Sequence, residues 1–324
     1  MRPKIEPPIL PLGRQPVTSR GRPSAPRVGS RSSRLAREQA RRVVTRLGTA
    51  WPELTPCLVT CPTTGDRTPD RPIAELAGVG VFARELERGL LTGELDLVVH
   101  SLKDLPVAST EDLTIGAVCE RDTVGDVLVC STGGTLADLP GGATVGTSSP
   151  RRRAQVLRAR GDVSVQDLRG NVDTRMQRVR DGAFDAIVLA EAGVRRLDLW
   201  GDDVHALPPA VMLPAPGQGA IAVQCRADDA SMLDLLSPID DPDARAAVDT
   251  ERAVLAGLGG GCAVPVGAWA VVEGGRLTLH AAVFAPDGSD DTRVEITGPA
   301  ADGEALARDA ARQLLDTGAS VWLR

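Results

Sequence analysis

The stretch Ala143-Thr-Val-Gly-Thr-Ser-Ser-Pro-Arg-Arg-Arg153 is typical of a strand that leads directly into a helix. We expect the strand to end at Thr147, because Ser149 is a favourable N-cap and Pro150 suits the first helical position. Arg151 and Arg152 follow at once. Since the N-terminus of a helix offers free N–H groups, this junction predicts an anion-binding site.

Two more junctions place arginines in the same way. The second is Val163-Ser-Val-Gln-Asp-Leu-Arg-Gly-Asn-Val-Asp-Thr-Arg175, where we expect Asn171 to cap the helix. The third is the strand Asp185–Ala190, followed by Gly193-Val-Arg-Arg196. Ligands of open α/β sheets bind at the carboxyl ends of strands, so the three arginine clusters predict an anionic ligand there.

The chain before and between these junctions alternates strands and helices from Arg27 to about residue 213. Strands are predicted at Arg27–Ser30 and Leu95–His100, and helices at Ser32–Leu47 and Phe82–Leu91. This alternation predicts an α/β fold with mostly parallel sheets covered on both faces.

The C-terminal part has a different pattern. A helix is expected at Asp243–Leu258 and another at Gly303–Leu315, with alternating apolar runs between them at Val264–Val272, Arg276–Phe284 and Thr292–Ile296. Strands of this kind joined by short turns predict an α+β domain with a small antiparallel sheet.

Composition limits the function. A chain of 324 residues is long enough for two or three domains, and no apolar run approaches the roughly 20 residues of a membrane helix. The net charge of −6 argues against a general nucleic-acid binder. Residues 1–26 are rich in arginine and proline, which predicts a disordered extension.

The six cysteines show no paired framework, and no secretory signal follows Met1, so we expect reduced thiols. Cys57 and Cys61 could form half of a metal site, but no second pair matches them, and we expect no metal. Cys262 lies in Gly257-Leu-Gly-Gly-Gly-Cys-Ala-Val-Pro-Val-Gly267. A thiol on such a flexible loop suits covalent attachment, although a lone cysteine is more often a small buried apolar residue.

A further polar cluster follows the strand that ends at His100. Ser101, Lys103 and Asp104 come where the crevice should open. Asp104 is either a carboxylate that stabilises positive charge and moves protons, or the structural ion-pair partner of Lys103. We expect His100 to be a hydrogen-bonded strand residue rather than a catalytic base.

Five motifs in order resemble the porphobilinogen deaminase family, also called hydroxymethylbilane synthases. They are His100-Ser-Leu-Lys-Asp104, Gly146-Thr-Ser-Ser-Pro-Arg-Arg152, Leu168-Arg-Gly-Asn-Val-Asp-Thr-Arg175, Leu213-Pro-Ala-Pro-Gly-Gln-Gly-Ala220 and Gly259-Gly-Gly-Cys262. Each is short, but their shared order and spacing are specific, and the resemblance covers residues 27 to 324.

The resemblance implies two lobes like those of periplasmic binding proteins and a C-terminal α+β domain. We therefore expect domain 1 at 27–120 plus 219–238, domain 2 at 121–218, and domain 3 at 239–324, after the 1–26 extension. It also implies a cytoplasmic monomer with no nucleic-acid or membrane partner.

The implied reaction joins four porphobilinogen molecules head to tail, with release of ammonia, to give the linear tetrapyrrole hydroxymethylbilane for haem biosynthesis. A dipyrromethane cofactor would be thioether-linked to Cys262, and Asp104 matches the catalytic aspartate of the family. Further positions match substrate or cofactor contacts: Arg31, Ser33, Phe82, Ser101, Lys103, Thr147, Ser148, Ser149, Arg151, Arg152, Arg169, Gly170, Asn171, Arg175, Arg196 and Gln218.

The chain departs from the family pattern in two places. Val79 stands where the family usually has a lysine, and Arg34 and Arg37 replace apolar residues. We expect these changes to weaken or alter the hold on the growing chain. The alternative to an active enzyme is a catalytically impaired paralogue that retains a cleft for carboxylates or tetrapyrroles.

Overall fold

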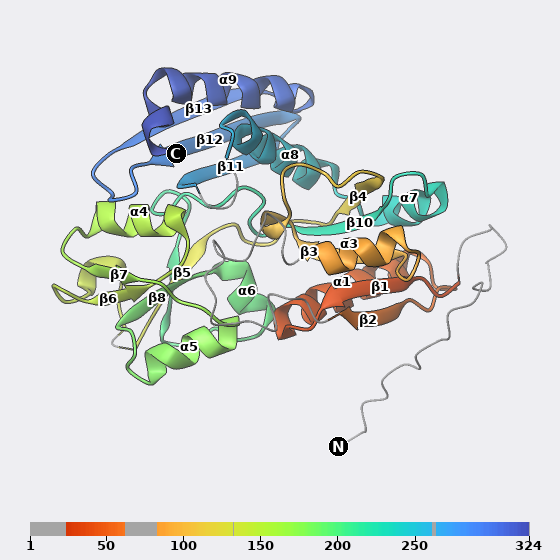
Figure 1. Cartoon of the computed structure of the whole chain (residues 1–324), viewed down its shortest axis with the longest axis horizontal. Coiled ribbons are helices and arrows are strands. Elements are labelled where there is room, and N and C mark those ends of the chain that lie inside the picture. Colours follow the sequence, from red (N-terminus) through yellow and green to blue (C-terminus); the bar gives the residue numbers. More distant parts are fainter. Residues whose placement is uncertain (1–23, 62–82, 132, 261–263, 324) are drawn as a thin grey trace.

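The computed structural model describes residues 24–61, 83–131, 133–260 and 264–323. Its described strands form three sheets, two of five strands and one of three (Figure 1). The mixed α/β class with a small antiparallel sheet is therefore confirmed. No helix in the described ranges has the length and apolar character needed to cross a membrane.

The first sheet has the strand order β2-β1-β3-β10-β4. Its strands are β1 (Arg27–Arg31), β2 (Cys57–Cys61), β3 (Leu97–Ser101), β4 (Leu113–Val118) and β10 (Ile221–Arg226). The helices beside it are α1 (Arg34–Ala50), α3 (Arg84–Leu91) and α7 (Ala230–Leu236). The predicted strand at Arg27–Ser30 and helix at Ser32–Leu47 are thus confirmed to within a few residues.

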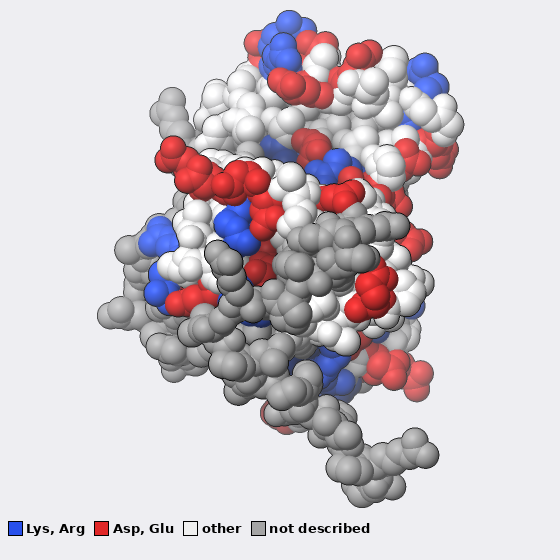
Figure 2. Space-filling view, turned by 90° about the vertical axis from the view of Figure 1, so that its right-hand side faces the viewer, with Lys and Arg blue, Asp and Glu red and all other residues white. Residues whose placement is uncertain are grey.

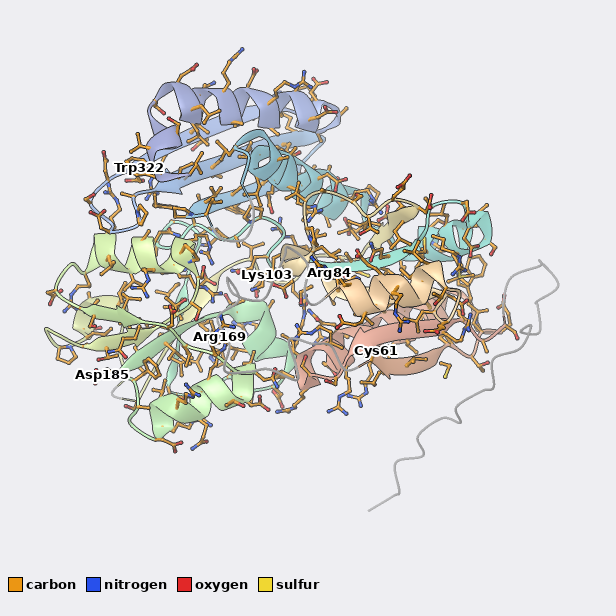
Figure 3. All side chains as sticks on the ribbon, in the orientation of Figure 1. Cys61, Arg84, Lys103, Arg169, Asp185 and Trp322 are labelled. Carbon is orange, nitrogen blue, oxygen red and sulfur yellow. The ribbon has the colours of Figure 1, made fainter. Side chains whose placement is uncertain are left out.

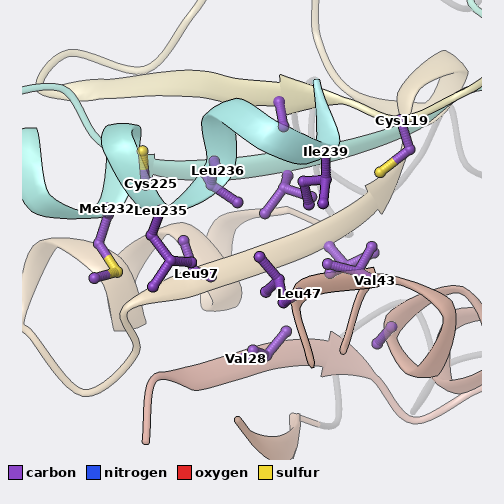
Figure 4. Packing of buried hydrophobic residues seen from close by; sticks show 14 of the residues in the cluster. Val28, Val43, Leu47, Leu97, Cys119, Cys225, Met232, Leu235, Leu236 and Ile239 are labelled. Carbon is purple, nitrogen blue, oxygen red and sulfur yellow. The ribbon is translucent and has the colours of Figure 1, made fainter. Parts of the chain in front are cut away.

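The core of this sheet is aliphatic. In Figure 4, Val28 and Leu97 from the strands face Val43 and Leu47 of α1. Leu235 of α7 belongs to the same cluster, although α7 lies almost 200 residues later in the chain than α1. Full burial of each such side chain stabilises the fold by roughly 1.5–3 kcal/mol, so α7 and β10 are integral to this lobe.

The second sheet has the order β7-β6-β8-β5-β9. Its strands are β5 (Asp126–Cys130), β6 (Thr144–Gly146), β7 (Ser164–Gln166), β8 (Ala186–Ala190) and β9 (Val204–Leu207). Its helices are α4 (Pro150–Ala159), α5 (Val172–Arg180) and α6 (Glu191–Arg196). All three begin directly after, or within a few residues of, the carboxyl end of a strand, as the three junctions predicted.

In each five-stranded sheet four strands run in the same direction and one runs against them, so the prediction of mostly parallel sheets is confirmed. β1 is parallel to β2 and β3, and β6 is parallel to β7 and β8. In contrast, β10 is antiparallel to both its neighbours, and so is β5. Both strands enter their sheet directly from the other sheet. Parallel neighbours are usually joined by a helix that crosses back over the same sheet. β5 and β10 have no such helix before them, so their direction is not constrained to be parallel.

The third sheet is the antiparallel meander β11 (Val266–Glu273), β12 (Arg276–Phe284) and β13 (Asp291–Pro299). Helices α8 (Pro242–Gly257) and α9 (Gly303–Asp316) cover one face through an aliphatic cluster. The predicted bounds of β12 are confirmed at both ends. Short 3-10 turns complete the description: η2 (Leu102–Asp104), η3 (Leu136–Asp138), η4 (Ser237–Ile239), η5 (Ala300–Asp302) and η6 (Ala319–Trp322).

The chain passes twice between the first two sheets. The first crossover, residues 119–125, joins β4 to β5, and the second crossover, residues 208–220, joins β9 to β10. The two lie side by side, because the Asp122 N–H donates to the Gly219 carbonyl at 3.3 Å. The carboxyl end of β3 and the start of β5 both lie next to the second crossover.

Candidate active site

Asp104 ends the turn η2, directly after β3. The preceding Leu102 is fully buried in a cluster that includes Ala220 of the second crossover, which fixes the turn. The Asp104 side chain is exposed and, among the described residues, has no hydrogen-bond or ion-pair partner. It lines a pocket together with the predicted site residues Arg31, Ser33 and Ser101.

The other pocket residues are held by local bonds. Gln39 of α1 donates from Nε2 to Ser101 Oγ at 2.7 Å. Ser33 caps α1 by accepting from the Ala36 N–H at 3.3 Å. Arg31 is half-buried at the end of β1. The described lining of the pocket thus comes from the first sheet and the segments beside it.

His100 is hydrogen-bonded at the end of its strand, as predicted. It is buried, and its Nε2 lies 3.0 Å from Gln224 Oε1. The Gln224 amide in turn donates to Glu87 at 3.0 Å. Burial lowers the pKa of His100 to about 4, even though the bond to Gln224 raises it.

Lys103 does not form the ion pair with Asp104 that its position allows. Its Nζ instead donates to Gln218 Oε1 at 3.3 Å, and no ion pair joins it to Asp104 within the described chain. Burial, followed by the nearby Arg152, lowers the pKa of Lys103 to about 8, while Asp104 and Asp126 oppose this shift. Figure 3 shows Lys103 near the centre of the molecule, where the three sheets converge.

The α4 junction forms as predicted. Ser149 is the N-cap and accepts from the Arg152 N–H at 3.4 Å, with Pro150 at the first helical position. Thr147 Oγ1 accepts from the Ser149 N–H at 3.2 Å. Ser148 Oγ donates to the Leu168 carbonyl at 2.9 Å, which ties this junction to the next one.

Arg151 and Arg152 share a buried partner that the sequence reading missed. Asp126, at the start of β5, is fully buried, 2.9 Å from Arg151 Nη1 and 2.7 Å from Arg152 Nη2. Burial alone would raise the pKa of Asp126, but the two guanidinium groups outweigh it and lower the pKa far below the ordinary value. The only signal in the sequence is a charged residue opening an otherwise apolar strand.

The second junction adds two cations. Arg169 and Arg175 are half-buried, and Arg175 Nε donates to the Gly170 carbonyl at 2.7 Å. Burial and the nearby Arg152 lower the pKa of Arg175 to about 10, while Asp104 raises it. Asn171 occupies the N-cap of α5 as predicted, but its side chain makes no capping bond.

Arg196 is buried and donates hydrogen bonds to both crossovers. Its Nε lies 2.7 Å from Asp122 of the first crossover, and its Nη2 donates to the Gly219 carbonyl of the second at 2.5 Å. Arg34, one of the departures from the family pattern, donates to the Leu197 carbonyl at 3.0 Å and so joins α1 to the end of α6. Phe82, Val79 and Cys262 lie outside the described residues.

Charges elsewhere on the surface are mixed. On the face in Figure 2, basic and acidic side chains lie next to one another, and its described part shows no continuous basic area. Cations instead gather near Asp104: Arg31 lines its pocket, Lys103 and Arg175 interact with its charge, and Arg152 lies near both. They come from four segments of the chain: β1, η2 and two strand-to-helix junctions of the second sheet.

Comparison with known protein families assigns nearly the whole chain to one family. Residues 27–234 match the family model "Porphobilinogen deaminase, dipyromethane cofactor binding domain", and residues 245–316 match "Porphobilinogen deaminase, C-terminal domain". The chain belongs to the porphobilinogen deaminase family.

Curated porphobilinogen deaminases are similar over most of their length. The Syntrophobacter fumaroxidans protein is 43% identical over 90% of this chain and 95% of its own. The Moorella thermoacetica protein is 47% identical over 92% of this chain and 95% of its own. The protein is accordingly a transferase, a hydroxymethylbilane synthase of tetrapyrrole biosynthesis.

Among solved structures, the periplasmic aliphatic sulphonate binding protein SsuA from Escherichia coli is similar, with a TM-score of 0.39 and 18% identity. The similarity covers 72% of this chain and 70% of that one. A likeness at this level carries no functional argument.

The described residues fit the dipyrromethane of this family. A ligand with several carboxylates needs guanidinium and ammonium donors that are not neutralised by the protein. Asp126 supplies one negative charge to two arginines, and Arg151 Nε is buried without a hydrogen-bond partner among the described residues. Lys103, Arg169 and Arg175 add further positive charge around Asp104. The pocket therefore keeps excess positive charge for a polyanionic cofactor.

Proposed function

We propose that Asp104 is the catalytic carboxylate and that Cys262 anchors the dipyrromethane from which the tetrapyrrole chain grows. The observation that carries the first assignment is the state of Asp104: an exposed carboxylate on a fixed turn, surrounded by cations, with no protein partner in the described chain. A carboxylate used only for structure would be paired.

Asp104 has two tasks in this proposal. Loss of ammonia from porphobilinogen leaves a positively charged pyrrole, which a carboxylate within the pocket stabilises. The same carboxylate accepts a hydrogen bond from a pyrrole N–H and assists removal of the ring proton after coupling. Both tasks require a group that is free to contact the substrate.

The cations bind the acetate and propionate groups. Arg31 lines the pocket, Lys103 and Arg175 interact with the charge of Asp104, and Arg169 lies near Arg175, so cations from both lobes are available to carboxylates. We infer that Arg151 and Arg152, fixed by Asp126, provide one rigid part of this surface. The bound dipyrromethane supplies the free pyrrole end to which each substrate molecule is added.

Intact mass tests the attachment. The purified chain is expected to carry the added mass of two linked pyrrole units, and Cys262→Ser is expected to lack it. Cys61→Ser, a change of the same kind on β2, serves as the matched control and should retain the added mass. Equal masses for the adducts of wild type and Cys262→Ser would rule out this anchor.

Replacing the carboxylate tests the catalytic assignment. Asp104→Asn keeps the size of the side chain and is expected to lower turnover by about a hundredfold to ten-thousandfold, because the negative charge and the proton acceptor are lost. Thermal unfolding should be nearly unchanged, since Asp104 has no partner to lose. Asp316→Asn at the exposed end of α9 is the control. Normal turnover by Asp104→Asn would show that the role is wrong, and no turnover by the wild type would favour the impaired paralogue.

We also propose three domains with the boundaries predicted above, a monomer, and a cytoplasmic location. The three sheets with separate aliphatic cores support the domain division, and the family assignment supports the other two. Light scattering after size-exclusion chromatography would test the monomer.

A further inference from the structure

Gln218 lies fully buried in the second crossover, with partners on every side of its amide. Its Nε2 faces three oxygens: the Val124 carbonyl at 2.8 Å, the Gly125 carbonyl at 3.1 Å and Asp126 Oδ1 at 2.9 Å. An NH₂ group suits this position, whereas an oxygen there would be repelled by all three. The orientation of the amide is therefore determined, and Oε1 must point the other way, towards Lys103.

The backbone around Gln218 is held just as closely. Arg121 Nε donates to the Gln218 carbonyl at 3.0 Å, and Arg196 Nη2 donates to the next carbonyl, that of Gly219. Arg121 belongs to the first crossover and Arg196 to α6 of the second lobe. Gln218 is thus fixed relative to both crossovers, and its side chain can act as a rigid support.

On these contacts we propose that Gln218 is a positioning residue: it ties the Lys103 ammonium to both crossovers and so fixes that cation beside Asp104. The proposal rests on the assignment of Lys103 to substrate carboxylates. It separates Gln218 from the residues that bind substrate directly, because its polar atoms in the described structure already have protein partners.

The hydrogen bond from Lys103 to Gln218 also affects the charge of Lys103. Among the described residues, Arg151 and Arg152 of α4 oppose the charge of Lys103, while Asp104 of η2 and Asp126 of β5 favour it. Gln218 Oε1 accepts a hydrogen bond from the ammonium form, and so it favours the charged state too. Without this acceptor, Lys103 would lose its proton at a lower pH, and carboxylate binding would weaken from that pH upward.

The composition of the chain allows a direct test. Lys4 and Lys103 are its two lysines, so lysine labelled with carbon-13 at Cε gives two NMR signals, and Lys4→Arg leaves that of Lys103 alone. The wild-type signal should titrate near pH 8. In Gln218→Leu, which has a similar size and no acceptor, we expect the midpoint to fall by about half a unit or more. Activity plays no part in this measurement, so its outcome does not depend on the assigned reaction.

A second variant and a control complete the test. Gln218→Glu keeps an oxygen facing Lys103, but its second oxygen must carry a proton to lie against the Val124, Gly125 and Asp126 oxygens, so its Lys103 midpoint should stay closer to the wild-type value than that of Gln218→Leu. Gln224→Leu removes another buried amide, on β10, and should lower thermal stability without moving the titration of Lys103. A Lys103 midpoint that is the same in wild type, Gln218→Leu and Gln218→Glu would overturn the proposal.

Kinetics provide the functional readout. Gln218→Leu should raise KM about tenfold with a smaller change in kcat, and the alkaline limb of kcat/KM should move to lower pH. In a Lys103→Arg background, where the cation stays charged, the leucine substitution should no longer move that limb. An equal shift in both backgrounds would mean that Gln218 acts through some group other than Lys103.

Discussion

Arg151 and Arg152 share a single counter-charge, the Asp126 carboxylate. Two guanidinium groups and one carboxylate leave a net charge of about +1 at this point of the pocket. The arrangement also fixes both side chains in position before any ligand binds, which reduces the conformational entropy lost on binding. A ligand carboxylate therefore meets an ordered cation rather than two mobile ones.

His100 gives a prediction at the same scale. Its pKa is lowered to about 4 by burial, against an ordinary value of 6.5. Between these two pH values the unfolded chain binds a proton that the folded chain does not, so the stability of the fold decreases as the pH falls from 6.5 to 4. His100→Gln, which keeps a hydrogen-bonding group beside Gln224, should remove this component, on the order of 3 kcal/mol.

The measurement is urea unfolding at pH 7 and pH 4.5 for wild type and variant. Glu87, Asp104 and Arg31 also act on His100, but they remain in both proteins, so the difference between the two isolates His100. His280→Gln is the matched histidine control, because His280 is a half-buried residue of β12. If His100→Gln loses as much stability on acidification as the wild type, His100 is not the buried neutral group that causes the loss.

Residues differ in how far the sequence predicts their roles. Ser149 and Pro150 were predictable because capping depends on neighbours within four positions. The sequence places Asp104 and Lys103 correctly at a strand end. It does not predict the partner of Lys103, which is Gln218, 115 positions later. The pairing of Asp126 with two arginines is equally remote in sequence, and local patterns carry no information about it.

At the scale of elements, the two crossovers depend on close backbone contact at Gly219. Its φ is +87°, and an added Cβ would lie 2.7 Å from the carbonyl oxygens of Asp122 and Thr123. Glycine adopts this conformation without a steric penalty and leaves room for the other chain. The same contact explains why β10 can return to the first sheet directly beside the segment that leaves it.

Gly219→Ala should therefore destabilise the protein by about 3 kcal/mol or more, from left-handed strain together with overpacking. Gly142→Ala is the matched control, because Gly142 has a φ of +79° but nothing within 4 Å of an added Cβ. It should cost about 1–2 kcal/mol from strain alone. Denaturant unfolding of both variants measures the difference, and equal losses would show that the crossovers are not in close contact.

The direction of strands was less predictable than their positions. The apolar runs identified β3, β8 and β12 because burial follows directly from hydrophobicity. β5 and β10 have similar composition, yet they run antiparallel to their neighbours. Their direction depends on the crossovers between the two sheets, a property of the whole chain that no window of sequence contains.

At the scale of the whole molecule, Glu251 joins the third sheet to the two crossovers. It is fully buried on α8, and its carboxylate accepts hydrogen bonds from Arg121 Nη1 at 2.7 Å and Nη2 at 2.9 Å. It also accepts the Gly217 N–H at 2.7 Å and the Ala270 N–H of β11 at 2.8 Å. One carboxylate thus binds the first crossover, the second crossover and the third sheet, and it lies under the segment that carries Gln218.

Glu251→Ala should be among the most destabilising single substitutions, at about 3–5 kcal/mol, because it leaves the largely buried Arg121 guanidinium without its counter-charge and two backbone N–H groups without acceptors. Glu120→Ala is the control: it breaks the ion pair with Arg46 on the surface and should cost less than about 1 kcal/mol. Urea unfolding gives both values. Hydrogen exchange should in addition show Ala270 and Gly217 losing protection together in Glu251→Ala, because one carboxylate holds both amides. A change confined to β11, with the Gly217 amide still protected, would mean that the third sheet is attached independently of the crossovers.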